Sequence, residues 1–246
     1  MKIAVLGGTG LIGSQVVKIL QAAGHEAVPH SQSTGVDLLT GAGLPEALKG
    51  AEVVVNLTNS PTFDEASPAF FRTTMDNMLT VAQQAGVGHA VILSIVGVDE
   101  VPALDYYRAK VLQEDILKAG PLPYSIVRAT QFFEFMEAVI SWTSDENGVR
   151  LPTTPVQPIA AADVAQAVAE VSAGTPLQGI RNIAGPDVFP LVELGKITLA
   201  ARGDHRTVTT DDSVGMFAAV PGDVLISKGD AFIAPTAYRE WLGRQG

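Results

Sequence analysis

The segment KIAVLGGTGLIG, residues 2–13, decides the fold, because an apolar run passes directly into a glycine-rich turn and then into a helical pattern. Residues 2–6 predict a buried β-strand, and residues 11–23 predict a helix. The three glycines at GxxGxxG spacing permit a tight turn, close approach of the backbone to a pyrophosphate, and close packing of helix on strand. The segment therefore predicts a strand–turn–helix unit that binds a dinucleotide.

The turn is the predicted phosphate site, since the N-terminus of the following helix presents N–H groups and a positive dipole end to an anion. The alternative is a glycine-rich turn without a ligand. The residues of this segment predicted to contact the cofactor are Gly7, Thr9, Gly10, Leu11, Ile12 and Gly13.

Short apolar strands alternate with longer helical patterns along the rest of the chain, which is typical of a parallel sheet covered on both faces. The expected fold class is α/β, a Rossmann-type doubly wound parallel sheet with a small C-terminal substrate lobe. Further strands are expected at residues 26–30, 52–57, 89–94, 124–128, 156–159 and 180–184, with a short extended piece at 36–39. Further helices are expected at residues 44–48, 68–85, 105–119, 131–142, 161–173, 191–201 and 235–242.

The chain of 246 residues shows no clear linker, so we expect a single domain over residues 1–246. Within it, residues 1–130 form the dinucleotide-binding core, which residues 156–184 continue. Residues 131–155 and 185–246 form the substrate-binding lobe.

Composition excludes several classes of protein. The 16 Lys and Arg against 26 Asp and Glu give a net charge of −10, which argues against a nucleic-acid or anionic-membrane partner. The absence of Cys excludes disulfides and thiolate sites, and the four scattered His have no metal-ligand spacing, so no metal is expected. No apolar run approaches the ~20 residues of a membrane span. We expect a cytoplasmic protein with a small-molecule substrate, and a homo-oligomer is possible.

The second strand predicts which dinucleotide is bound. NAD sites place an acidic residue after this strand, whereas residues 30–34 here read HSQST, so we predict NADP, with NAD possible. Ser31, Gln32 and Ser33 are the predicted contacts with the 2′-phosphate. Asp37, beside Leu38, is predicted to contact the adenine, and capping a turn is an equally good interpretation. Three residues at the end of a later strand are predicted to contact the ribose: Asn56, Leu57 and Thr58.

Tyr106 and Lys110 are four positions apart, which places a phenol and an ammonium one turn apart on a helix. A phenol with a pKa of ~10 needs a nearby cation to favour its ionised form, and Lys110 supplies that charge and a donor for a ribose. Ser94 ends a strand where a ligand crevice is expected, and its hydroxyl is predicted to hold a substrate carbonyl. Taken singly, each residue also has a structural explanation; Lys110 and Glu114, for example, form an ordinary helix pair.

Five segments of the chain resemble the short-chain dehydrogenase/reductase superfamily, in particular its atypical, NmrA-like NAD(P)-binding branch. They are GGTGLIG (7–13), LSIVGVD (93–99), YYRAK (106–110), IVRATQFFEF (126–135) and PIAAADVAQAV (158–168). The resemblance implies that Ser94, Tyr106 and Lys110 perform proton transfer. It also implies that Thr130, with Gln131 and Phe132, lies near the nicotinamide. Gln32 departs from the Arg that NADP-using relatives often carry.

An aromatic-rich segment follows, and Phe132, Phe133 and Met136 are predicted to line an apolar substrate pocket. Plain core packing is an equally good explanation of this stripe. The predicted function is an NAD(P)H-dependent oxidoreductase that transfers hydride to a small, moderately apolar carbonyl compound or quinone. The alternatives are a non-catalytic NAD(P)-binding redox sensor and a nucleotide-sugar epimerase or dehydratase.

Overall fold

The computed structural model describes residues 1–245, whose backbone divides into two compact units. Unit 1 consists of Met1–Ser94, Asp105–Arg128 and Val164–Arg181. Unit 2 consists of Ile95–Leu104, Ala129–Asp163 and Asn182–Gly246. The single domain expected from the sequence stays a prediction.

A seven-stranded sheet with the order β12-β9-β5-β4-β3-β1-β2 is the centre of the fold. Its strands are β1 (Lys2–Leu6), β2 (Glu26–His30), β3 (Val53–Asn56), β4 (His89–Ile95), β5 (Tyr124–Ala129), β9 (Gly179–Ala184) and β12 (Phe232–Ile233). β1 pairs in parallel with both β2 and β3, so that Ile3 lies opposite Ala27 on one side and Val53 on the other. This parallel sheet with its helices confirms the expected Rossmann-type α/β fold.

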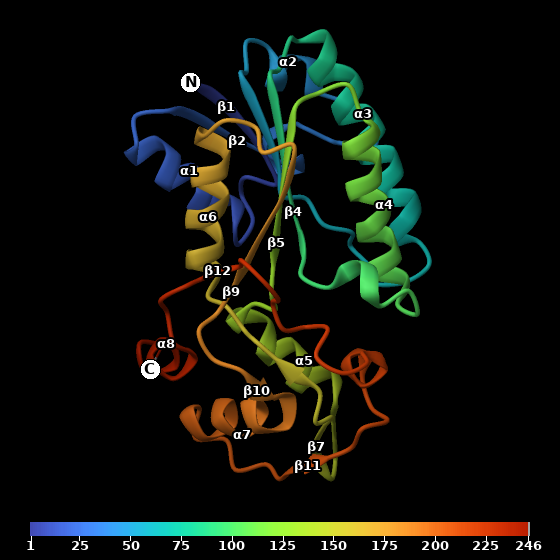
Figure 1. Ribbon diagram of the computed structural model, residues 1–246, viewed down its shortest axis with the longest axis vertical. Helices are drawn as coiled ribbons and strands as arrows, with labels where there is room; N and C mark the ends of the chain where they lie inside the picture. Colours follow the sequence, from blue (N-terminus) through green and yellow to red (C-terminus); the bar gives the residue numbers. More distant parts are fainter. Residues whose placement is uncertain (246) are drawn as a thin grey trace. The chain divides into compact units, whose positions relative to one another are not determined.

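Helices cover both faces of the sheet (Figure 1). One face carries α1 (Gly13–Ala22) and α6 (Ala161–Ala173), and the other carries α2 (Leu44–Leu48), α3 (Ser67–Gln84) and α4 (Asp105–Ala119). On the α2–α4 face, buried apolar side chains of the helices pack on those of the strands, for example Met78 and Leu117 against Val54 and Ile92. The strands read as continuous apolar runs because both of their faces are buried.

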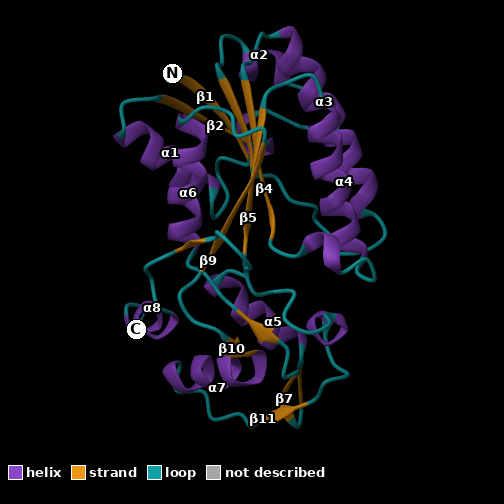
Figure 2. Cartoon of the chain, viewed as in Figure 1, coloured by secondary structure: helices purple, strands orange, loops and turns teal. Residues whose placement is uncertain are grey.

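Unit 2 is built from short elements (Figure 2). Its helices are α5 (Met136–Trp142), α7 (Leu191–Ala201) and α8 (Tyr238–Gly243). A small sheet joins β6 (Ser144–Asp145), β7 (Gly148–Leu151) and β11 (Val208–Thr210), and β8 (Pro155–Val156) pairs with β10 (Phe189–Pro190). Its aromatic core includes Phe133, whose ring centroid lies 4.9 Å from that of Tyr238 and 5.4 Å from that of Trp241.

Three expected elements differ in kind from the structure, and the helix expected at residues 235–242 begins only at Tyr238. The helix expected at residues 131–142 begins as a 3₁₀ turn at Phe133–Phe135 and becomes α-helical only at Met136. Residues 36–37 belong to no strand and residues 38–40 form a turn, in which Gly41 N–H bonds back to the Asp37 carbonyl at 2.8 Å. The expected strand at residues 156–159 is the two-residue β8, because only a short stretch of it finds a partner strand.

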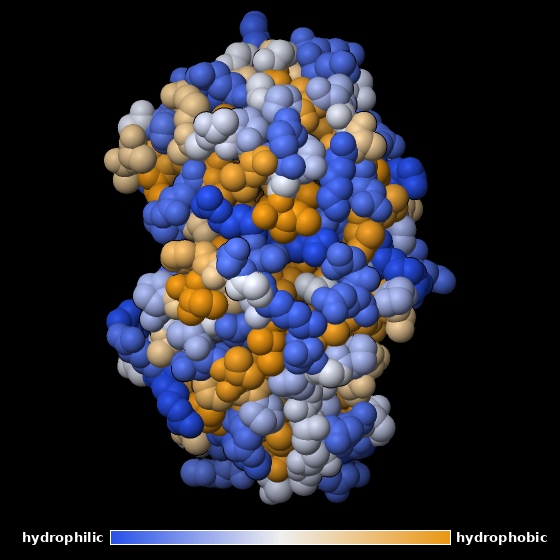
Figure 3. Space-filling model, in the orientation of Figure 1, coloured by the Kyte–Doolittle hydropathy of each residue, from blue (hydrophilic) through white to orange (hydrophobic). Residues whose placement is uncertain are grey.

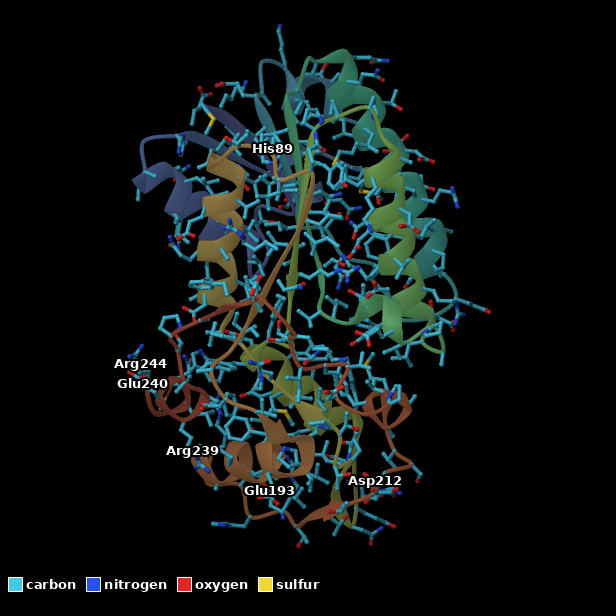
Figure 4. All side chains as sticks on the ribbon, in the orientation of Figure 1. His89, Glu193, Asp212, Arg239, Glu240 and Arg244 are labelled. Atoms are coloured by element: carbon cyan, nitrogen blue, oxygen red, sulfur yellow. The ribbon has the colours of Figure 1, made fainter. Side chains whose placement is uncertain are left out.

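No helix within residues 1–245 combines the length and apolar character needed to cross a bilayer. The visible face mixes polar and apolar side chains (Figure 3). Among the same residues, no group of three or more acidic or His side chains is arranged to hold a metal. His89 (Figure 4) is buried at the start of β4 with its Nε2 2.8 Å from Ser125 Oγ, and burial lowers its pKa.

Candidate functional site

The glycine-rich turn after β1 is held by backbone contacts that exclude larger side chains. The N–H groups of Gly7 and Gly8 both donate to the carbonyl oxygen of His30, at 2.8 and 3.1 Å. Gly7 has a φ of +75°, and a Cβ atom there would lie 2.9 Å from the carbonyl carbon of Leu57. A Cβ atom on Gly13 would lie 2.2 Å from the Gly7 oxygen, so only glycine lets α1 begin against the turn.

Gly10 differs from these glycines because the position that its Cβ atom would occupy is nearly open. A Cβ atom there would meet only the Gly7 oxygen, at 3.3 Å. The helix α1 begins three residues later, so its positive N-terminal end lies at the turn. This open cradle at a helix N-terminus fits a dinucleotide pyrophosphate, with the backbone of residues 7–13 as the predicted contact.

The strand order places a topological switch point beside this turn. β1 lies between β2 and β3, so the connections that leave the sheet on the two sides of β1 run in opposite directions. Open α/β sheets bind ligands at such a point, outside the carboxyl ends of the strands. Asn56 ends β3, is 1% exposed, and accepts hydrogen bonds from the N–H (3.0 Å) and hydroxyl (2.6 Å) of Thr58. Asn56 therefore shapes the loop, and a contact of Leu57 or Thr58 with the ribose stays a prediction.

The segment after β2 is ordered by its own hydroxyl groups. The Ser31 and Ser33 oxygens lie 2.8 Å apart, and Ser31 N–H donates to Thr34 Oγ1 at 2.8 Å. Both serines are at the surface together with Gln32. Asp37 Oδ1 accepts the Leu39 N–H at 2.8 Å, so this carboxylate caps a turn. Contacts of Asp37 and of the buried Leu38 with the adenine stay predictions.

Tyr106 lies in the first turn of α4, and its phenol is nearly covered. Its hydroxyl donates to Asn59 Oδ1 at 2.6 Å, and the ring of Phe63 meets its ring edge-on at 4.7 Å between centroids. Only 8% of the residue is exposed. This burial raises the pKa of Tyr106 to about 12, so that the phenol stays protonated at neutral pH.

Lys110 lies one turn further along α4, and its amine is buried. Nζ donates to the Leu93 carbonyl oxygen at 2.7 Å and to the side-chain oxygen of Gln113. It also lies 4.9 Å from the centre of the Phe71 ring. Burial lowers the pKa of Lys110 to about 7, an effect that the nearby Glu114 carboxylate partly opposes.

The predicted electrostatic role of Lys110 therefore needs correction. The sequence predicts a Tyr106 phenol whose pKa is lowered by Lys110, whereas its pKa in the structure is raised. The reason is the burial of the phenol itself, while Lys110 directs its amine at Leu93 and Gln113. The structure does place both side chains on one face of α4, where each approaches the ring of Phe71.

Ser94 ends the part of β4 that belongs to unit 1, and its hydroxyl is buried beside Glu114. This carboxylate accepts hydrogen bonds from Arg128 at 2.8 and 2.7 Å and from Lys118 at 3.1 Å. Burial of Glu114 raises its pKa, but Arg128 and, to a smaller extent, the Ser94 hydroxyl and Lys118 favour the charged carboxylate, so the pKa of Glu114 is lowered overall. The Ser94 hydroxyl does so without forming a hydrogen bond of full geometry. The predicted contact of Ser94 with a substrate oxygen thus requires its hydroxyl to turn away from Glu114.

The remaining predicted contacts belong to unit 2. Thr130 Oγ1 and the side-chain amide of Gln131 are buried without a hydrogen-bond partner among residues 1–245, as expected of groups that meet a bound molecule. Phe133 and Met136 are 1% and 3% exposed and belong to the core, while Phe132 is half-buried. A substrate pocket lined by these three stays a prediction.

Sequence reasoning missed Asn59, Phe63 and Gln113 as neighbours of the Tyr106 and Lys110 side chains. Asn59 had one signal in the sequence, because it is a polar residue just beyond the carboxyl end of a strand. Gln113 had one as well, because it lies three positions after Lys110 on the same helix, whereas Phe63 had none, since its contact arises only when the loop of residues 57–66 packs on α4.

The burial of Lys110 predicts a pH-dependent stability. Its pKa rises from about 7 in the folded chain to 10.5 on unfolding, so the unfolded chain binds more protons between these values. The free energy of unfolding should then increase with pH across that window, by up to about 1.4 kcal/mol per pH unit, and be flat below it. Lys110→Met should remove this increase in urea unfolding measured at several pH values, whereas the exposed-site control Lys18→Met should retain it. An unchanged slope in Lys110→Met would assign the increase to another group.

Sequence comparison identifies the family of the chain. A family model described as NAD(P)H-binding matches residues 7–173, which include the glycine-rich turn, Ser94, Tyr106 and Lys110. This match confirms the NAD(P)-binding fold that the sequence resemblance implied. A search of curated protein sequences gives no match.

Solved structures share the fold at low sequence identity. Escherichia coli NADPH-dependent quinone oxidoreductase QOR2, complexed with NADPH, superimposes with a TM-score of 0.76 and 18% identity over 99% of each chain. MoeE5 in complex with UDP-glucose and NAD gives a TM-score of 0.72 and 21% identity over 100% of this chain and 97% of that chain. Thermus thermophilus UDP-glucose 4-epimerase, complexed with NAD, gives 0.70 and 18% over 85% and 86%. At these identities the similarity shows the fold alone.

Proposed function

Because the chain belongs to the family of NAD(P)H-binding proteins, we propose that it is an NAD(P)H-dependent oxidoreductase of the short-chain dehydrogenase/reductase type. The proposed substrate is a small, moderately apolar carbonyl compound or quinone. The observation that carries the proposal is the placement of Tyr106 and Lys110 on α4, in the same unit as the dinucleotide turn. The full-length similarity to the E. coli quinone oxidoreductase supports the substrate class.

The proposed chemistry divides between the cofactor and the chain. A bound reduced nicotinamide supplies the hydride. Tyr106, held protonated by its burial, donates a proton to the substrate oxygen as negative charge develops there. Lys110, whose pKa burial lowers to about 7, is proposed to donate to the cofactor ribose rather than to lower the pKa of the phenol. Ser94 orients the substrate oxygen once its hydroxyl turns from Glu114.

We also propose NADP as the preferred cofactor. Ser31 and Ser33 offer surface hydroxyls to a 2′-phosphate, and residues 30–34 carry no carboxylate to bind the ribose hydroxyls of NAD or to repel a phosphate. Fluorescence titration with NADPH and NADH is expected to give tighter binding of NADPH. Equal affinities for the two nucleotides would contradict the preference.

Turnover provides the test of the enzyme assignment. The wild-type chain, incubated with NADPH and a panel of quinones, aldehydes and ketones, is expected to consume the reduced nicotinamide with at least one of them. Product analysis by mass spectrometry should find the corresponding alcohol or hydroquinone. Consumption of NADPH that proceeds equally without added substrate would not count as this activity.

A redox sensor is the second candidate, and the burial of the site favours it. Tyr106 and Lys110 are 8% and 4% exposed, so neither reaches solvent freely. A sensor predicts tight cofactor binding that discriminates the redox state, with no turnover on any carbonyl compound. A nucleotide-sugar epimerase or dehydratase is the third candidate, supported by the similarity to MoeE5 along the chain, and it predicts that NAD copurifies with the protein.

A further inference from the structure

The hydroxyl of Tyr106 already has a direct partner in this chain, and that partner is a side-chain amide. The Tyr106 oxygen lies 2.6 Å from Asn59 Oδ1, although the two residues are 47 positions apart in the sequence. A phenol carries one proton and donates one hydrogen bond at a time. The group that faces the Tyr106 oxygen therefore influences how readily its proton leaves.

The loop of residues 57–66 holds Asn59 in place from both sides. On one side, Thr58 is fixed by two hydrogen bonds to the buried Asn56. On the other side, Ser60 N–H donates to Asn59 Oδ1 at 3.0 Å, and Ser60 Oγ accepts from the buried Ser67 at 3.1 Å. Asn59 itself is exposed, so its contact with Tyr106 follows from the loop geometry and not from burial of its own side chain.

Proton donation leaves a phenolate that needs a hydrogen-bond donor. The hydride pair forms the new C–H bond, the C=O π pair moves to the substrate oxygen, and the Tyr106 O–H bond breaks as its proton joins that oxygen; water later returns a proton to the phenolate. Lys110 is an imperfect donor for this anion, since its amine is committed to Leu93 and Gln113. An amide has both functions, because its oxygen accepts from the phenol and its nitrogen donates to the phenolate.

We infer that Asn59 is a further catalytic residue. Its carboxamide oxygen accepts the Tyr106 hydroxyl before reaction, and the carboxamide then rotates, releases the Ser60 N–H and donates its Nδ2–H to the phenolate. The inference rests on the proposed oxidoreductase function. It assigns to Asn59 the stabilisation of a charge that appears only when the proton is transferred, so its contribution belongs to kcat more than to KM.

Two substitutions test this role. Asn59→Leu keeps the approximate size and removes both hydrogen-bonding functions, whereas Asn59→Asp keeps an acceptor for the phenol and replaces the donor with a negative charge. Both variants should lower kcat by about tenfold to a hundredfold with little change in KM, as expected for a lost hydrogen bond to a charged group. If Asn59 only positions the phenol, Asn59→Asp keeps most of its activity, and that result would overturn the inference.

A second measurement does not depend on turnover. Fluorinated tyrosine, whose phenol is more acidic, is incorporated in place of tyrosine. Fluorine NMR then follows the titration of the Tyr106 phenol in the absence of cofactor. The Tyr106→Phe variant, which lacks this resonance, assigns it. Both Asn59 variants should raise the pKa of this phenol, since a buried phenolate loses its donor. An unchanged or lower pKa in Asn59→Leu would contradict the inference. The same two changes at the exposed Asn147, in the turn between β6 and β7, serve as controls.

The two measurements separate the possible failures. A wild-type chain that reduces no carbonyl compound refutes the proposed function, and the catalytic role of Asn59 with it, while the NMR titration still reports whether the amide stabilises the phenolate. A wild-type chain whose turnover depends on Tyr106, but not on Asn59, refutes only this inference.

Discussion

Replacing Tyr106 with Phe is expected to lower kcat for carbonyl reduction by about a hundredfold to ten-thousandfold, the usual contribution of a positioned general acid. The substitution removes only the hydroxyl, so the ring keeps its contacts with Phe63 and Phe71. The glycine-rich turn is unaffected, and the affinity for NADPH should therefore change little. Steady-state kinetics with the best substrate of the panel, together with a cofactor titration, measures both quantities.

A matched substitution at another tyrosine controls for the loss of a hydroxyl. Tyr124 begins β5 in the same unit, at the opposite end of a strand from the expected ligand crevice, and Tyr124→Phe should keep wild-type kinetics. Full turnover by Tyr106→Phe would remove Tyr106 from the mechanism. The lost hydrogen bond to Asn59 should cost only about 1 kcal/mol of stability, so unfolding is not expected to account for the loss of activity.

The fold could be predicted from local pattern because each element carries its own signals. β2 (Glu26–His30), α2 (Leu44–Leu48), α4 (Asp105–Ala119), α6 (Ala161–Ala173) and α7 (Leu191–Ala201) occupy the residues expected from apolar periodicity and glycine or proline stops. The short strands of unit 2 were missed, since pairs such as Ser144–Asp145 have too few residues for a periodicity. Their strand conformation depends on a partner strand, which the local sequence does not contain.

The site was predictable only to the level of its residue types and spacing. The four-residue interval of Tyr106 and Lys110 places them on one helical face, and the structure has them there. Their electrostatics was not predictable, because the shifted pKa values come from the burial of both side chains, and the Tyr106 partner Asn59 lies 47 positions away in the sequence. Tertiary packing creates this burial and this contact, and no local pattern encodes them.

Replacing Glu114 with Gln is expected to destabilise the chain by about 3 to 5 kcal/mol, the usual effect of removing one partner from a buried ion pair. Glu114 has no exposed surface, and its carboxylate joins Arg128 of β5 to α4 through hydrogen bonds of 2.8 and 2.7 Å. Gln has nearly the same size, so no cavity forms, but the buried guanidinium loses this negative charge. Urea unfolding at neutral pH measures the difference.

An exposed pair provides the control for this substitution. Glu193 on α7 (Figure 4) bonds Lys196 at 2.7 Å, with about half of each side chain exposed, and Glu193→Gln should change stability by less than about 1 kcal/mol. Equal losses in the two variants would mean that burial does not determine the strength of the Glu114 pair.

A double substitution distinguishes the pair from the space it fills. Glu114→Gln combined with Arg128→Met removes both charges and should be more stable than Glu114→Gln alone, because the buried guanidinium that has lost the Glu114 charge is then removed as well. The folded pKa of Glu114 is lowered, so its contribution is present above the unfolded value and is lost as pH falls toward the folded one. The double variant should therefore lose less stability in acid than the wild type. If it is instead as unstable as Glu114→Gln at neutral pH, the polar contacts of these side chains, and not their opposite charges, stabilise the packing of α4 on β5.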